Sequence, residues 1–149
     1  MIHIQCPGKV LDSKKEKWFL AGGITGCSDW QSEILSYLKD LDFIAINPRR
    51  KFFDINKKDI EEEQIRWEFD ALKKSDAVSF WFPSETLCPI TLYELGKISM
   101  TKKKILIGVH PDYKRINDIK IQTKLLRPEI KIVDSLKDLS KQIIGDLSK

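Results

Sequence analysis

The stretch Asp76-Ala77-Val78-Ser79-Phe80-Trp81-Phe82 decides the fold class. It is short and almost continuously apolar, which is typical of a central strand in a parallel sheet that is covered on both faces. Two other stretches, Lys17–Ala21 and Lys104–Val109, have the same character. Segments with the apolar spacing of amphipathic helices lie between them. Strands that alternate with helices predict an α/β fold with a doubly wound, mainly parallel sheet.

The rest of the chain supplies the other elements of such a fold. Asp42–Asn47 is predicted to form a strand and Ile130–Val133 a short one, which gives about five strands in a flavodoxin-like or Rossmann-like arrangement. Helices are expected from Ser28, from about Lys58 to Ser75, from Thr91 to about Met100, and from Ser135 to about Leu147. Residues 112–128 mix charged and apolar side chains and give no clear pattern.

Three of the helix starts carry the spacing of a capping box. Ser28 precedes Gln31 by three residues, and Ser135 precedes Asp138 in the same way. Thr91 repeats this spacing with Glu94, which places Glu94 in the first turn of its helix.

Length and composition indicate one domain that spans residues 1–149. Hydrophobic residues make up 42% of the chain, an ordinary globular value. No apolar run approaches the ~18 residues of a membrane span, and Met1–Leu20 lacks the features of a signal peptide. The three cysteines are widely spaced and form no CxxC motif, which favours a reducing, cytoplasmic setting over a disulfide framework or a zinc site.

Charge and histidine content argue against several classes of partner. The net charge is +4, but much of it lies in short lysine clusters such as residues 102–104, which favours a solvated surface over nucleic-acid binding. The two histidines are isolated, and no cluster has the spacing of metal ligands. We therefore expect no nucleic-acid or membrane partner and no metal.

The predicted sheet also indicates where a ligand binds. Ligands of doubly wound sheets lie beyond the carboxyl ends of the strands, where the strand order reverses. Four loops follow predicted strands and end at this edge: Gly22–Asp29, Asn47–Lys51, Phe82–Thr91 and Val109–Tyr113. Candidate site residues are therefore sought in these loops and in the helices that face them.

Glu94, in the stretch Thr91-Leu92-Tyr93-Glu94-Leu95-Gly96, has two interpretations. A capping role is one, because a first-turn glutamate suits the helix dipole. The other is a nucleophile that points into the ligand crevice and is kept ionised by nearby backbone N–H groups.

Glu68, in the stretch Arg66-Trp67-Glu68, also has two interpretations. It is a surface residue paired with Arg66 or Lys73, or it is an acid that protonates a leaving base. The acid role fits an apolar setting beside Trp67, because such a setting raises the pKa of a carboxyl group.

Several residues near these loops are candidates for substrate binding. Gly22 and Gly23 allow close approach of the backbone to a ligand, although a generic turn explains them equally well. Arg49, which follows Asn47 at the end of a strand, suits either a phosphate contact or solvent exposure. Trp30 and Trp67 stack on a nucleobase or pack in the core, whereas Trp81 is expected in the core.

Taken together, the stretches resemble the nucleoside 2-deoxyribosyltransferase-like family. The resemblance rests on an ordered set of segments between Trp18 and Val109: Phe19 to Gly26 with Asp29-Trp30-Gln31, Asn47-Pro48-Arg49-Arg50, Gln64-Ile65-Arg66-Trp67-Glu68, Asp76 to Phe82, and Thr91 to Gly96. The chain departs from the better-known branch at Phe19, where that branch carries a tyrosine, and around Cys88, where it carries an acidic residue.

The resemblance implies a flavodoxin-like fold and an enzyme that transfers or hydrolyses the N-glycosidic bond of a nucleoside or nucleotide. The substrate is then a small molecule, and this reaction needs no metal and no cofactor. Glu94 matches the family's nucleophile, and Glu68 matches the acidic residue that assists the base. The matching segments also make Asp29 and Asn47 candidates for substrate binding. Family members commonly form oligomers, so the resemblance implies a homo-oligomer. Two alternatives stay open, a glycohydrolase that acts on NAD or a related nucleotide and a non-catalytic nucleotide-binding module.

Overall fold

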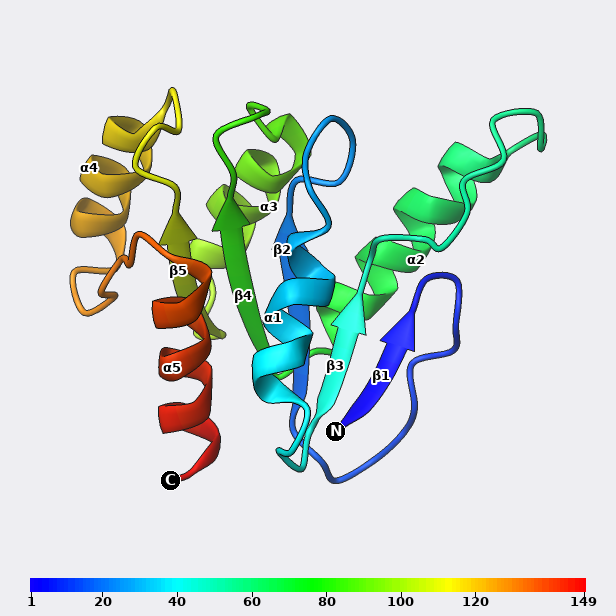
Figure 1. Ribbon diagram of the computed structural model, residues 1–149, viewed down its shortest axis with the longest axis horizontal. Coiled ribbons are helices and arrows are strands. Elements are labelled where there is room, and N and C mark those ends of the chain that lie inside the picture. Colours follow the sequence, from blue (N-terminus) through cyan, green and yellow to red (C-terminus); the bar gives the residue numbers. More distant parts are fainter.

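The computed structural model describes residues 1–149 and is built on one five-stranded sheet in which every strand pair is parallel (Figure 1). Its strands, in the spatial order β1-β3-β2-β4-β5, are β1 (Ile2–Gln5), β2 (Lys17–Gly22), β3 (Ile44–Asn47), β4 (Ala77–Phe82) and β5 (Lys104–Val109). This arrangement confirms the predicted α/β fold with a flavodoxin-like parallel sheet.

The fifth strand is not the one that the sequence predicts. Ile130–Val133 makes only an isolated parallel bridge, between Val133 and Gly108 at the edge of β5. The extra strand is β1, which pairs with β3 at the opposite edge of the sheet. The segment at Val133 nevertheless lies where the last strand of the flavodoxin order 2-1-3-4-5 belongs. The strand order reverses at β2, so the loops that follow β2 and β4 flank the switch point.

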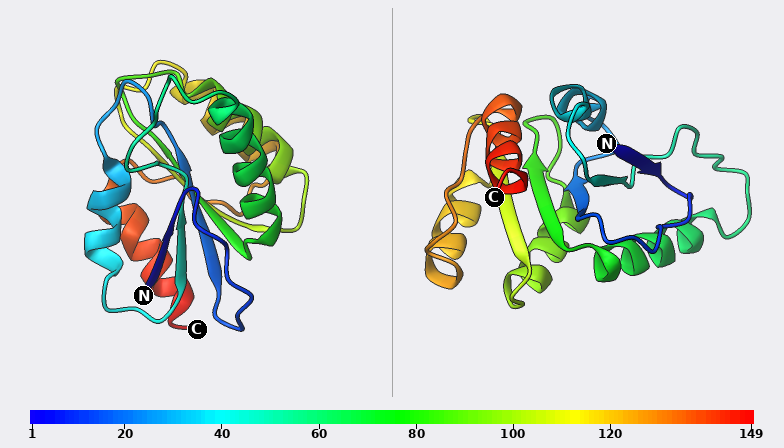
Figure 2. Two further views of the ribbon diagram at one scale, coloured as in Figure 1. Left: turned by 90° about the vertical axis from the view of Figure 1, so that its right-hand side faces the viewer. Right: turned by 90° about the horizontal axis from the view of Figure 1, so that it is seen from below.

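Helices cover both faces of the sheet (Figure 2). One face carries α1 (Trp30–Leu38) and α5 (Leu136–Leu147), and the other carries α2 (Ile60–Lys74), α3 (Pro89–Ser99) and α4 (Ile116–Leu126). Helix α4 occupies the region for which the sequence gives no pattern. None of the helices is both long enough and apolar enough to cross a bilayer.

The sheet separates two apolar clusters, one under each layer of helices. Trp18, Trp30 and Trp81 are buried with side chains of α1 and α5, whereas Phe19 and Phe80 lie in the cluster under α2, α3 and α4. All six residues of β4 are buried, as expected for a central strand. The core position predicted for Trp81 is confirmed.

Two of the predicted helix starts differ from the observed ones. Helix α1 is capped by Asp29, whose carboxylate accepts a hydrogen bond from the backbone N–H of Ser32 at 3.1 Å, so the capping box predicted at Ser28 is wrong. Helix α3 begins at Pro89, two residues before the predicted start. The cap predicted for α5 is confirmed, because the Ser135 hydroxyl accepts from the Asp138 N–H at 3.1 Å.

Candidate active site

The loops after β2 and β4 meet at the carboxyl edge of the sheet. A β-carbon placed on Gly23 would lie 3.0 Å from each of Cys27 Sγ, Cys88 Sγ and Pro83 Cγ, so residues of both loops surround this glycine. The backbone N–H of Ser28 also donates to a Glu85 carboxylate oxygen at 3.4 Å. Contacts between these two loops therefore bridge the carboxyl edge of the sheet at the point where the strand order reverses.

Glu94 lies in the second turn of α3 and is buried, with 7% of its surface exposed. The helix begins early because Cys88, at φ 49°, turns the chain and Pro89 supplies a favourable first helical residue. No acidic residue stands in the first turn, so the predicted capping box of Thr91 and Glu94 is wrong. A helix-capping role therefore does not explain Glu94.

The expectation that backbone N–H groups keep Glu94 ionised is also wrong. Burial raises the pKa of Glu94 from the usual 4.5 to about 8, and the negative charge of Glu68 adds to this effect. The Lys97 ammonium opposes it weakly. The Glu94 carboxyl group lies beyond the first turn of α3, and its burial there outweighs any effect that would keep it ionised.

Glu68 faces the same region from α2. Burial raises its pKa, while the Gln64 amide and the Arg50 guanidinium act in the opposite direction. The direction agrees with the raised pKa predicted for an acid in an apolar setting. The negative charge of Glu68 thus acts on Glu94 on the neighbouring helix, and a carboxyl group in this setting favours retention of its proton at neutral pH.

A network of hydrogen bonds around Gln64 supports Glu68. The Gln64 Nε2 group donates to Glu68 Oε1 at 2.7 Å, and Gln64 Oε1 accepts from Arg50 Nε at 2.6 Å. Arg50 also binds Glu63 at 2.7 Å. The sequence analysis did not single out Gln64, although its spacing of four residues from Glu68 on a helix is the spacing of a contact pair.

The two glycines predicted to allow close approach to a ligand have other protein groups close to their α-carbons. A β-carbon on Gly22 would overlap the indole ring of Trp30 and would lie 2.6 Å from the Trp81 carbonyl oxygen. The Trp30 indole N–H donates to the Gly23 carbonyl at 2.9 Å, and Trp30 is only 1% exposed. Its ring is therefore not open to a ligand, and the core interpretation of Trp30 is the one that the contacts support.

Side-chain contacts link the end of β3 to the start of α1 through Asn47, Arg49 and Asp29. Arg49 Nε donates to Gln31 Oε1 at 2.9 Å and lies 3.3 Å from an Asp29 carboxylate oxygen. Arg49 Nη2 donates to the Ser28 carbonyl at 2.9 Å, and the Arg49 backbone N–H donates to Asn47 Oδ1 at 2.9 Å. These contacts occupy much of the Arg49 guanidinium, for which the sequence left a phosphate contact and solvent exposure as alternatives.

Trp67 is half-buried beside the acidic pair. Its ring lies 6.5 Å from that of Phe19, and its indole N–H donates to the Gly8 carbonyl at 2.8 Å. The Lys97 ammonium lies 5.6 Å from the ring centre of Phe69 and 5.4 Å from that of Tyr93, so it stands between α2 and α3.

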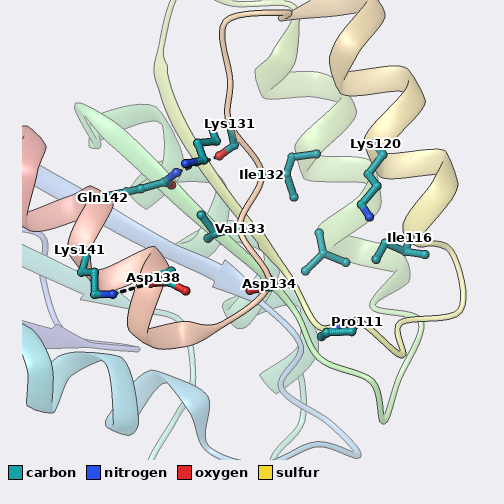
Figure 3. Close-up of a pocket in the computed structure, with 11 residues that line it drawn as sticks. Pro111, Ile116, Lys120, Lys131, Ile132, Val133, Asp134, Asp138, Lys141 and Gln142 are labelled. Carbon is teal, nitrogen blue, oxygen red and sulfur yellow. Dashed lines mark hydrogen bonds and ion pairs between the residues drawn. The ribbon is translucent and has the colours of Figure 1, made fainter.

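A separate hollow of about 760 Å³ lies beyond the end of β5, between α4, α5 and the segment that joins them (Figure 3). Three lysines and two aspartates line it: Lys120, Lys131, Lys141, Asp134 and Asp138. Lys141 pairs with Asp138 at 2.7 Å, and none of the residues predicted for the site contributes to the lining. Across the chain, no group of three or more His, Cys, Asp or Glu side chains has the arrangement of metal ligands.

Comparison with known proteins relates most of the chain to one protein family. A family model described as "Nucleoside 2-deoxyribosyltransferase like" matches residues 15–113. The chain belongs to this family. A search of curated proteins finds no match.

The match to the nucleoside 2-deoxyribosyltransferase-like family spans β2 to β5 and includes both Glu68 and Glu94. Strand β1 and helices α4 and α5 lie outside the matched region. The hollow beyond β5 is built mostly from these unmatched residues, which separates it from the part of the chain that defines the family.

Proposed function

We propose that the chain breaks the N-glycosidic bond of a nucleoside or nucleotide and passes the sugar to a second base or to water. One observation carries the proposal: half-buried Glu68 on α2 and buried Glu94 on α3 both have a raised pKa within the region that defines the family, and the negative charge of Glu68 adds to the shift of Glu94. A carboxylate nucleophile and a protonated carboxylic acid are the two groups that retaining glycosyl chemistry requires.

The reaction uses the single proton of the pair. In the reactive form Glu68 holds the proton and Glu94 is ionised, which the nearby Lys97 ammonium favours. Glu94 attacks the anomeric carbon, the bond from this carbon to the base nitrogen breaks, and the base takes the proton of Glu68. The products of this step are a free base, an ester of the sugar with Glu94, and an ionised Glu68.

The second step restores both carboxyl groups. Water or an acceptor base attacks the anomeric carbon and transfers a proton to Glu68, and Glu94 leaves as a carboxylate. Two inversions give net retention at the sugar. The choice between transfer and hydrolysis depends on how well the base site excludes water.

The test is chromatography of the purified protein with a panel of nucleosides, nucleoside monophosphates and NAD, each with and without a free acceptor base. We expect base release or exchange that is lost in Glu94→Gln and strongly reduced in Glu68→Gln. Glu62→Gln, on the exposed part of α2, is the matched control and retains activity. Mass spectrometry of an acid-quenched reaction is expected to find the sugar on the peptide that contains Glu94.

A non-catalytic nucleotide-binding module is the second candidate. It is favoured by the absence of any hydrogen-bond donor that holds Glu94 in its ionised form, because a protonated glutamate is a poor nucleophile. Calorimetric titration separates the two candidates. A binder gives equal affinity for wild type and Glu94→Gln with no turnover in either, whereas the enzyme gives turnover in wild type alone.

Self-association belongs to the same proposal. Ile65 and Phe69 on α2 and Ile90 and Tyr93 on α3 are apolar or aromatic side chains that remain exposed near the acidic pair. We propose that a second copy covers them, and light scattering of wild type and of Tyr93→Lys tests this.

The three free thiols fit the reducing, cytoplasmic setting that we also propose.

A further inference from the structure

The side-chain amide of Gln64 makes four hydrogen bonds, which use all of its donors and acceptors. Nε2 donates to Glu68 Oε1 at 2.7 Å and to the Pro48 carbonyl at 2.9 Å. Oε1 accepts from Arg50 Nε at 2.6 Å and from Cys6 Sγ at 3.1 Å. An amide offers two N–H donors and two oxygen lone pairs, so Gln64 has no further hydrogen-bonding capacity.

The partners also fix which way the amide points. Arg50 carries only donors, so the atom that faces it must be the amide oxygen. The Pro48 carbonyl only accepts, so the atom that faces it must be the amide nitrogen. Rotating the amide by half a turn would set donor against donor at Arg50 and acceptor against acceptor at Pro48. Gln64 therefore always presents an N–H to Glu68.

We propose that Gln64 is the positioning residue for the acid of this site: by binding Oε1 of Glu68, it leaves Oε2 as the oxygen that carries the proton and delivers it to the leaving base. This inference rests on the proposed function. An oxygen that already accepts an N–H is the less favourable place for a proton, because the proton would compete with that donor. Gln64 thus selects one of two oxygens without touching the substrate.

Charged and titratable groups face Glu68 from three directions. Arg50 approaches from the segment after β3 and favours the ionised carboxylate, while Glu94 approaches from α3 and couples to Glu68 by charge repulsion. The Cys6 thiol lies after β1, and burial keeps it protonated, with a pKa of about 11. Any measurement on Glu68 must therefore separate the effect of Gln64 from that of Glu94.

The experiment is a carboxyl ¹³C titration of Glu68 by NMR, in protein labelled at glutamate. A Glu94→Gln background removes the coupled partner, and the Glu68 resonance is assigned by its loss in Glu68→Gln. Gln64→Met removes the N–H donor. Gln64→Glu also removes it but keeps an acceptor for Arg50, so it is the second variant if the methionine variant does not fold. Gln142→Met is the matched control, because Gln142 Nε2 donates to the Lys131 carbonyl at 2.9 Å, away from the acidic pair.

We expect the Glu68 midpoint to rise by about one pH unit in Gln64→Met, and at least as far in Gln64→Glu, because each loses a donor that favours the carboxylate. Gln142→Met leaves the midpoint unchanged. In the otherwise unmodified protein, the Gln64 Nε2 resonance is expected to move with the midpoint of Glu68. Gln64→Met is also expected to lower kcat about tenfold with little change in KM, since it misplaces the acid and spares substrate contacts.

A Glu68 midpoint that stays within about 0.3 unit of the parent value in both Gln64 variants would overturn the inference. A Gln64 amide resonance that ignores the ionisation of Glu68 would overturn it as well. If the midpoint moves as expected but the wild type releases no base from any substrate, the hydrogen-bond role of Gln64 is supported and the proposed function fails.

Discussion

Replacing Glu94 by glutamine is expected to stabilise the protein at neutral pH while it abolishes turnover. The native protein holds a proton on Glu94 up to a pKa of about 8, whereas the unfolded chain releases it near the usual 4.5. Between these values the native state binds more protons than the unfolded state. The free energy of unfolding therefore falls as pH rises, by about 1.4 kcal/mol per pH unit.

The loss of stability grows with the difference between the pH of the experiment and 4.5, the pKa of Glu94 in the unfolded chain. At pH 7 the wild type has lost about 3 kcal/mol of stability to the deprotonation of Glu94 in the unfolded chain, and at pH 5 it has lost less than about 1 kcal/mol. Glutamine has nearly the shape of a protonated glutamate and does not titrate. The stability gained in Glu94→Gln should thus be small at pH 5 and about 3 kcal/mol at pH 7, or roughly 6–12 °C in Tm.

The assay is urea unfolding of both proteins at several pH values from 4.5 to 8, followed by circular dichroism. Glu62→Gln serves as the control, because this exposed side chain on α2 pairs only with Arg66 and should give no pH-dependent difference. A stability difference between Glu94→Gln and wild type that is the same at pH 5 and pH 7 would refute the buried, proton-holding state of Glu94.

Three other predictions follow from the same structure. The kcat/KM for base release should fall about tenfold from pH 7 to pH 9, because the acidic pair loses its one proton near pH 8; a flat profile measured with a buffered substrate series would contradict this. Gly22→Ala should lower the free energy of unfolding by about 3 kcal/mol, because the new methyl group overlaps Trp30 and the Trp81 carbonyl oxygen. Gly96→Ala has open space in a helix and should raise the free energy of unfolding by about 0.5–1 kcal/mol, so equal melting temperatures of the two variants would count against this. Ser135→Ala should cost about 1 kcal/mol in a urea titration through loss of the α5 cap, and an unchanged midpoint would argue against that cap.

Most of the fold is predictable from the sequence because the central strands are buried on both faces. Continuous apolar runs mark β2, β4 and β5, and their bounds agree closely with the prediction. Strand β1 is not predicted because it has no continuous apolar run. Its polar and apolar residues alternate, and Ile2 and His3 are exposed at the sheet edge. Ile130–Val133 has the apolar character of a strand, but only Val133 forms the bridge to β5.

The raised pKa of Glu68 is predictable from its apolar neighbours, whereas the raised pKa of Glu94 is not. The sequence places Glu94 after the central strand, yet its pKa depends on where α3 begins, and the Pro89 signal for an earlier start was missed. The side chains that pack against Gly22 and Gly23 could not be predicted from the sequence either. Gly22 faces Trp30, which is eight positions along the chain, and nothing in local spacing reveals that this ring fills the place assigned to a ligand.

The contact between Gly22 and Trp30 has a consequence for how relatives of this chain vary. The indole ring occupies the volume of a β-carbon at position 22, and its N–H is bound to the next carbonyl, that of Gly23. A smaller residue at position 30 would thus remove one of the two obstacles to a side chain at position 22, and the Trp81 carbonyl oxygen would remain. We expect the two positions to change together in evolution, with the glycine retained wherever the tryptophan is. A pair of substitutions that costs less stability together than the sum of the two single changes would be the laboratory form of that constraint.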